Sequence, residues 1–196
     1  NVHYAHGCVY LVMERRVRQR IRGFNIGDNA SVLMRARLDA DLTRRESWTF
    51  ASELPFDEAW AQAAPSGVAV PFYDYDPIEG KQLAPGRHFY PPGWLETNVV
   101  QISDPRHIWH DPTGRTFHLF ARAHTGGTGY ACLAKVVEQG PRGGEGEMIT
   151  QLETVPSGQK VLYVPMPGGQ MRFHILQDPQ TGLYWLASTQ ATDSMT

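Results

Sequence analysis

A nearly all-β fold is predicted by a turn that occurs twice with the same flanks and by a composition rich in turn-forming residues. Each copy has Asp-Pro and a following glycine between two apolar, aromatic-rich runs, at residues 106–122 and 172–188. Proline presets φ, aspartate bonds to its own backbone and glycine accepts a positive φ, so both copies are expected to be β-hairpins. Residues 3–14 form a weaker third copy. Hairpins that recur after about 65 residues or more suggest repeated sheets, and a radial array of such sheets is a β-propeller.

Length and composition agree with this class. The 196 residues are enough for one domain with a sizeable core. Aromatic residues make up 11%, with 19 glycines and 14 prolines, which favours short strands joined by tight turns over a helical bundle. The net charge of −2 gives no global field that would recruit nucleic acid or an acidic membrane. The sequence also lacks an apolar run of about eighteen residues, so no membrane span is expected.

The chain reads as a piece of a longer protein, because it begins inside one strand-like run and stops just after another. No signal peptide is visible, so a secreted or periplasmic location would need a targeting segment outside residues 1–196. The compartment and the oligomeric state are therefore left open. Cys8 and Cys132 lie in apolar runs and are expected to be buried free thiols, with a disulfide as the alternative.

The first half of the chain predicts strands, one short helix and two irregular stretches. Apolar or β-prone runs predict strands at residues 9–12, 31–38 and 48–50. Acidic residues in its first turn favour a helix at residues 57–64.

One irregular stretch lies between the first two predicted strands, and the other follows the helix. Residues 15–29 are basic and then rich in glycine and asparagine, which predicts an exposed excursion. Its arginines fit a solvated hairpin first and an anion-binding lip second. Residues 65–93 show little periodicity, and a loop this long is usually functional or an insertion. The aromatic cluster at 72–76 fits a sugar-stacking rim or a solvated loop equally well.

The second half predicts strand after strand. The runs lie at residues 94–102, 106–122 (the first hairpin), 129–137, 148–155, 161–165 and 172–188 (the second hairpin). Connections of hairpin length and the near absence of helix predict a propeller segment of about three blades, each an antiparallel four-stranded sheet. A β-sandwich is the alternative, because regular turn signals also occur there.

Polar residues collect at the end of each predicted hairpin that lies opposite its turn. Glu14 ends the N-terminal copy, Arg122 and His124 end the first hairpin, and Arg172 begins the second. Ligands of propellers bind where strand ends and loops converge, so these ends predict one polar cleft built from several sheets. Glu96 follows Trp94 and Leu95, and an apolar setting would raise its pKa toward that of a general acid; the alternative is a solvated strand-edge residue.

For several other polar residues a structural role is the alternative to a functional one. His124 and His174 are read as sugar-facing or as packing residues. Asp111 and Asp178 are expected to be turn formers. The His-x-x-His spacings at residues 3–6 and 107–110 would point to opposite faces of a strand, so no metal and no cofactor is expected.

Two segments carry a resemblance to a known family. Residues 93–100, Gly-Trp-Leu-Glu-x-Asn-Val-Val, resemble a motif of bacterial sialidase-like propeller proteins. Residues 167–173, Pro-Gly-Gly-x-x-Arg-Phe, do so too, followed by Asp178-Pro179 and by Gly-Leu-Tyr-Trp-Leu at 182–186. The resemblance covers most of residues 90–190 and implies that residues 1–196 are part of a five- or six-bladed propeller. The Asp-box of true sialidases is not present in this sequence, so the identity of the sugar is left open.

The resemblance implies a carbohydrate substrate and glycoside hydrolysis. Glu96 would act as acid/base or nucleophile, and Asp193 would be a second carboxylate. Arg122 and Arg172 would hold a substrate carboxylate or hydroxyls. The remaining expected substrate-binding residues are His124, His174 and Gln190. A non-catalytic glycan-binding or scaffold propeller is the alternative, and two carboxyl groups about 5–10 Å apart across a cleft would favour hydrolysis.

Overall fold

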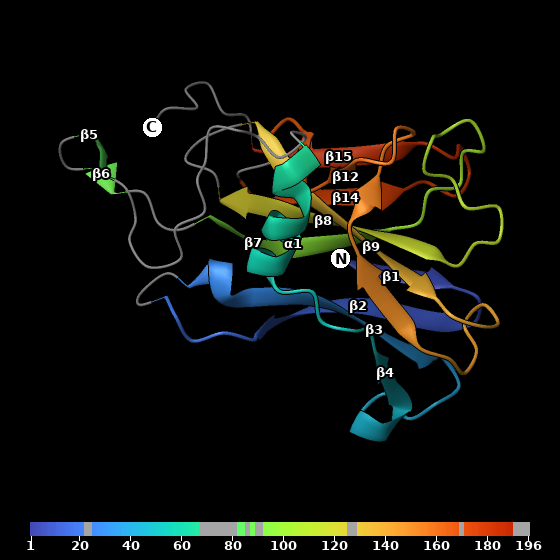
Figure 1. Ribbon diagram of the computed structural model, residues 1–196. Coiled ribbons are helices and arrows are strands. Elements are labelled where there is room, and N and C mark those ends of the chain that lie inside the picture. The colour runs from blue at the N-terminus through green and yellow to red at the C-terminus, as the bar shows by residue number, and fades with distance from the viewer. Residues whose placement is uncertain are drawn as a thin grey trace.

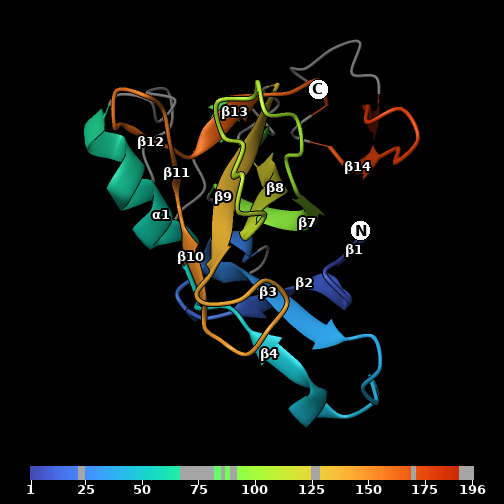
Figure 2. The ribbon, with the colours of Figure 1, turned by 90° about the vertical axis from the view of Figure 1, so that its right-hand side faces the viewer.

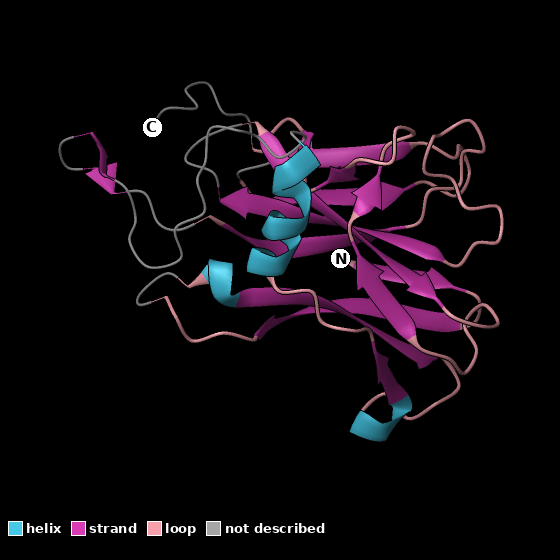
Figure 3. Cartoon of the chain, in the orientation of Figure 1, coloured by secondary structure: helices cyan, strands magenta, loops and turns pink. Residues whose placement is uncertain are grey.

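The computed structural model describes residues 1–21, 25–66, 82–84, 87–88, 92–124, 129–168 and 171–189. These residues form antiparallel sheets with one α-helix among them (Figure 3), which confirms the predicted predominance of β-structure. No helix within these ranges is both long enough and apolar enough to cross a membrane.

The first sheet is a four-stranded antiparallel meander in which spatial order follows chain order (Figure 1). Its strands are β1 (Val2–Ala5), β2 (Cys8–Arg16), β3 (Asn29–Arg37) and β4 (Trp48–Phe50). His6 and Gly7 both have positive φ, 54° and 73°, at the β1–β2 turn. A two-residue turn with two positive φ angles matches the right-handed twist of a hairpin, so the N-terminal copy is also a hairpin.

The second sheet repeats this order with one added strand. It therefore has five strands where four were predicted, and the remaining described sheets have two strands each. The second sheet contains β7 (Gly93–Val100), β8 (Thr116–His124), β9 (Tyr130–Glu138) and β10 (Met148–Gln151), and β13 (Tyr163–Pro165) also pairs with β9. Gly93 begins β7 where a side chain could not fit, because an added Cβ would lie 2.5 Å from the backbone of Ile26 and of Gly27. Glycine there permits the close approach of two backbones.

The predicted hairpin at residues 106–122 is wrong in its first strand. Residues 106–110 form no strand, and β8 pairs with β7 instead, across a connection of residues 101–115. Local turns use the polar groups of this stretch: the backbone N–H of Arg106 donates to the Asp104 side chain, and that of His107 to the Asp104 carbonyl. Hydrogen bonds of this kind compete with a strand ladder. The turn itself is present, with the Gly114 N–H donating to the Asp111 carbonyl.

The second predicted hairpin is confirmed. β14 (Phe173–Gln177) pairs with β15 (Tyr184–Ser188) across the turn at residues 178–182. All five residues of β15 are exposed, and three of them, Tyr184, Trp185 and Leu186, are large hydrophobic residues. Two further two-stranded pairs are β11 (Glu153–Thr154) with β12 (Lys160–Val161), and β5 (Gln82–Ala84) with β6 (Arg87–His88).

Helix α1 (Phe56–Ala63) confirms the predicted short helix with a shift of one residue. It lies in front of the strands in Figure 1 and at their side in Figure 2. Its buried Phe56 meets the ring of Trp94 edge-on, with the centroids 5.4 Å apart. Three 3-10 turns complete the helical structure: η1 (Ile26–Asp28), η2 (Arg45–Ser47) and η3 (Ala64–Ser66).

The main core joins the first and second sheets. The Tyr10 ring stacks on Phe117 with centroids 4.2 Å apart. Beside them Arg35 and Glu138 form a buried ion pair of 2.6 Å, and the Tyr10 hydroxyl donates to the same carboxylate. Burial and the Glu138 carboxylate raise the pKa of Tyr10 well above its usual value, so it stays a hydrogen-bond donor.

A smaller core lies between the second sheet and the β14–β15 hairpin. Its buried members are Val100, Ala131, Phe173 and Ile175.

Asparagine side chains connect three successive units of the chain: the first sheet, the second sheet and the β14–β15 hairpin. The Asn98 amide donates to the Phe173 carbonyl and accepts from the Ile175 N–H, so it pairs with β14 as a backbone unit would. Asn1 does the same with Val99: it accepts from the Val99 N–H and donates to the Val99 carbonyl. The first strand of each unit is therefore fixed against that of the next.

The basic excursion is neutralised by acidic partners. Arg16 pairs with the fully buried Asp28 at 3.2 Å, and Arg20 pairs with Asp57 at 2.7 Å. Arg15 contacts Glu53, and Arg18 contacts Glu58. These contacts favour a structural role for this segment over an anion-binding lip. Its predicted exposure holds only in part, because Ile21 and Ile26–Asp28 are buried.

Candidate functional site

A β-bulge in strand β7 places Glu96 at the candidate site. The register of β7 on β8 passes from Leu95 opposite Arg122 to Asn98 opposite Phe120, so two residues of β7 face one of β8. Glu96 has a φ of +53°, which a residue with a side chain rarely adopts. A bulge redirects a side chain out of the regular pleat, and residues held in such conformations are enriched at functional sites.

The Glu96 carboxylate lies between two guanidinium groups. Arg122 Nη1 donates to Oε2 at 3.3 Å and Arg172 Nε donates to Oε1 at 2.8 Å. Glu96 and Arg122 are about a quarter exposed, whereas Arg172 is 84% exposed. The three side chains therefore meet, as predicted, but Arg122 does not line the cavity next to them. Their roles toward a ligand stay predictions.

A polar cavity of about 340 Å³ opens beside this cluster. It is lined by Asn1, Val12, Glu14, Glu96, Thr97, Asn98, Arg172, Phe173 and His174. These residues come from all three units: β1–β4, β7–β10 and β14–β15. His174 is exposed and belongs to this cavity, as predicted for a ligand-facing residue.

Glu14 is a second acidic residue at this site. Its sequence position is at the polar end of the N-terminal copy, and the sequence predicts no role for it in the site. It lies near the end of β2, and its Oε1 accepts the backbone N–H of Glu96. No local pattern singles it out, because the contact spans 82 residues of sequence. The cavity thus contains two carboxylates from neighbouring sheets.

Of the other predicted site residues, His124 lies in the described part of the chain, whereas Asp193 and Gln190 do not. His124 lies at the end of β8, opposite Gly93, where burial and the nearby Arg122 charge lower its pKa. Asp193 and Gln190 lie outside the described residues, as does the aromatic cluster at 72–76.

The two turn aspartates have the structural role expected of them. Asp111 accepts from Thr113, Arg115 and Thr116, and Asp178 accepts from Gln180 and Thr181. Cys8 and Cys132 are buried free thiols, as predicted. Within the described ranges no three His, Cys, Asp or Glu side chains are grouped so as to hold a metal ion.

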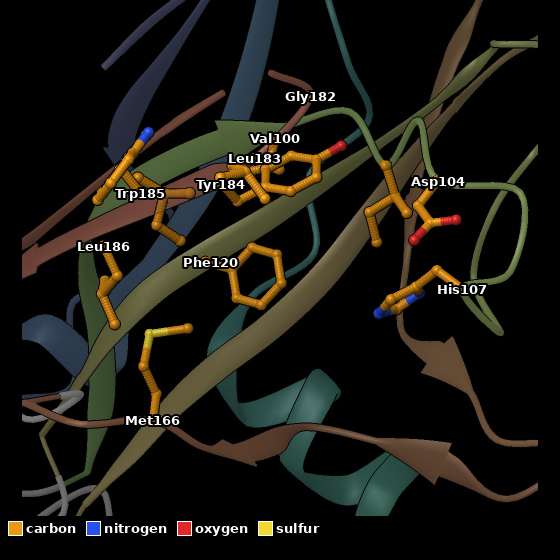
Figure 4. A pocket seen from close by; sticks show the side chains of 12 residues that line it. Val100, Asp104, His107, Phe120, Met166, Gly182, Leu183, Tyr184, Trp185 and Leu186 are labelled. Carbon is orange, nitrogen blue, oxygen red and sulfur yellow. The ribbon is translucent and has the colours of Figure 1, made fainter. Parts of the chain in front are cut away.

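A second cavity, of about 400 Å³, is apolar. Figure 4 shows the side chains that line it, among them Phe120, Met166, Leu183, Tyr184 and Trp185. It continues the small core between the second sheet and the β14–β15 hairpin. Asp104 and His107 lie together at one side of it in this view, and Asp104 is paired with Arg106 at 3.0 Å. Most of its lining is apolar, whereas most residues that line the Glu96 cavity are polar or charged.

A buried polar triad lies on the second sheet. His118 Nε2 is 2.7 Å from Glu153 Oε2, and Lys135 donates to the other Glu153 oxygen at 2.7 Å. Burial alone would raise the pKa of Glu153, but these two partners outweigh it and lower the pKa. Trp109 stacks over the His118 ring at 5.9 Å and covers it. The triad satisfies a buried carboxylate and joins β8, β9 and β11.

Comparison with known proteins adds no assignment. No protein-family model, no curated protein and no solved structure matches this chain.

Proposed function

We propose that residues 1–196 are part of a carbohydrate-active β-propeller and that the cavity lined by Glu96 and Arg172, with Arg122 paired to Glu96 beside it, is its ligand site. The observation that carries the proposal is the Glu96 carboxylate held between two arginines in a polar cavity where three sheet units meet. Arginine forks and carboxylates are the groups that bind sugar hydroxyls and sugar carboxylates by charge-assisted hydrogen bonds.

The propeller part of the proposal is supported by repetition. Two antiparallel meanders follow one another along the chain, and asparagines join their first strands. The β14–β15 hairpin begins a third unit in the same way. The sialidase-like sequence segments contribute Glu96, Asn98 and Arg172 to this arrangement.

The proposed activity is glycoside hydrolysis. Both oxygens of Glu96 accept from arginines, so the carboxylate is suited to act as an anion, that is as a nucleophile or a base, and less suited to donate a proton. Asp193 remains the proposed partner acid. Arg172, the more exposed arginine, is the proposed contact for a substrate carboxylate or hydroxyl.

Non-catalytic glycan binding is the second candidate. It is favoured by the same two contacts, because a carboxylate engaged by two arginines can order a binding surface without any reaction.

The test compares hydrolysis of chromogenic sialosides, uronides and neutral glycosides by the complete protein and by its Glu96→Gln variant. Gln keeps the shape of the side chain but loses its charge and its basicity. We expect a loss of about 10²–10⁴-fold in kcat, the range typical of a lost catalytic acid or base. Glu46→Gln, at an exposed position of η2, is the matched control and should leave kcat unchanged.

Binding measurements separate the two candidates. Arg172→Ala should weaken binding of anionic sugars more than that of neutral sugars, because it removes a charge-assisted contact. A wild-type protein that binds glycans and hydrolyses none of the panel would establish the binding module. Hydrolysis by Glu96→Gln at the wild-type rate would refute the assignment of Glu96.

A further inference from the structure

The bulge that presents Glu96 is held by a cross-strand pair of the neighbouring sheet. Glu14 on β2 and Ser31 on β3 are register partners. Glu14 accepts the backbone N–H of Glu96, and the hydroxyl of Ser31 is 2.7 Å from that of Thr97. Glu96 and Thr97 are the two bulged residues, so each is anchored by one member of the same pair.

These contacts supply hydrogen-bond partners that the bulge does not find within its own sheet. An extra residue in a strand leaves backbone groups out of the ladder, and the Glu96 N–H finds its acceptor in the first sheet. A carboxylate acceptor makes this a charge-assisted hydrogen bond, which is stronger than a neutral one. A non-glycine residue with a φ of +53° persists when its surroundings fix it in place, which is the condition that Glu14 and Ser31 provide.

We propose that Glu14 is a positioning residue: its carboxylate holds the Glu96 backbone in the left-handed conformation and so aims the Glu96 side chain at Arg122 and Arg172. In this role Glu14 needs an acceptor oxygen and transfers no proton. Its consequence for catalysis rests on the function proposed above, whereas the contact itself does not. The inference makes the site a joint product of two sheets, one that carries Glu96 and one that fixes it.

The contact is tested by the amide proton chemical shift of Glu96 in ¹H–¹⁵N spectra. A strong hydrogen bond to a carboxylate moves this proton downfield. Glu14→Ala should move the Glu96 signal upfield, whereas Glu14→Gln, which keeps an acceptor oxygen, should retain most of the wild-type shift. Glu14→Met is a second variant without an acceptor and preserves the apolar stem of the side chain. An unchanged Glu96 amide in both Glu14→Ala and Glu14→Met would overturn the proposal.

The consequence is tested by steady-state kinetics on any glycoside that the wild-type protein hydrolyses. Misplacement of a reacting group by about 1 Å can cost about 10²-fold. We therefore expect Glu14→Ala to lower kcat by about that factor with a much smaller change in KM, and Glu14→Gln to restore kcat. If Glu14→Gln is as inactive as Glu14→Ala, Glu14 is itself a catalytic carboxylate and the positioning role is wrong. If the wild-type protein hydrolyses nothing, the proposed activity fails, while the amide shifts still decide the role of Glu14.

Discussion

At the scale of single residues, the chemistry of turns was readable from the sequence and that of the bulge was not. Asp111 and Asp178 precede proline and stand near glycine, a local pattern that defines a turn whatever surrounds it. Glu96 stands in an ordinary strand-like run, and its left-handed φ occurs together with a contact to Glu14 on another sheet. Sequence reasoning placed Glu96, Arg122 and Arg172 together because each lies at the end of its predicted strand unit that is opposite the turn.

The Asp111 turn gives a pH-dependent prediction. Burial would raise the pKa of Asp111, but hydrogen bonds from Thr113, Thr116 and the Arg115 backbone outweigh it and lower the pKa from 3.8 to about 2. A depressed pKa in the folded state means that the ionised form stabilises the fold above about pH 4. This stabilisation is lost as the pH falls toward 2.

The shift corresponds to about 2.4 kcal/mol at most, and solvent screening of this partly exposed side chain reduces the expected contribution to about 1 kcal/mol. Asp111→Asn should therefore lower the free energy of unfolding by about that amount at pH 7. The difference from wild type should shrink between pH 4 and pH 2, as measured by urea denaturation. Asp178→Asn, in the exposed turn, is the control with a smaller expected effect. A difference that is independent of pH would contradict the assignment.

At the scale of elements, the sequence predicts the positions of the strands more accurately than the pairing between them. The predicted runs at 31–38, 94–102 and 129–137 match β3, β7 and β9 within two residues at each end. The run at 106–110 was misassigned, because aromatic composition resembles a strand while Asp104 and its neighbours close local turns. Pairing depends on which hydrogen-bonding groups remain free after such turns form, and a single sequence does not show this.

The buried ion pair between Arg35 on β3 and Glu138 on β9 allows a test of how the two sheets are joined. Arg35 and Glu138 are nearly inaccessible to solvent, and Glu138 also accepts from Tyr10 and from the Gly143 N–H. Arg35→Met would leave a buried carboxylate without its cation, at a cost of about 3–5 kcal/mol in the free energy of unfolding.

Removing both charges should cost less than the two single substitutions together, because no uncompensated ion remains. The double variant Arg35→Met/Glu138→Leu, measured by urea denaturation beside both single variants, completes the cycle. Additive effects would show that the two side chains contribute independently and that the pair does not couple the sheets.

At the scale of the whole molecule, the Glu96 cavity is one of several concave sites formed by the described residues. The Glu96 cavity is polar and is built from three units, whereas the cavity under Tyr184 and Trp185 is apolar and lies against an exposed hairpin. The repeat of hairpins along the sequence predicted that polar ends would meet. It could not predict the apolar cavity, because its lining comes from the way β14 and β15 pack on β7 and β8 (Figure 4).

The most direct test of the central claim is an NMR titration with sialic acid, glucuronic acid and methyl glucoside. It follows the arginine Nε–H and the tryptophan indole N–H signals in one experiment. We expect the Arg172 Nε–H signal to shift with the acidic sugars, and to shift less in Glu96→Gln, while the Trp185 indole signal stays in place. A shift of Trp185 without one of Arg172 would assign the ligand site to the apolar cavity. The absence of any shift with all three sugars would contradict the carbohydrate site.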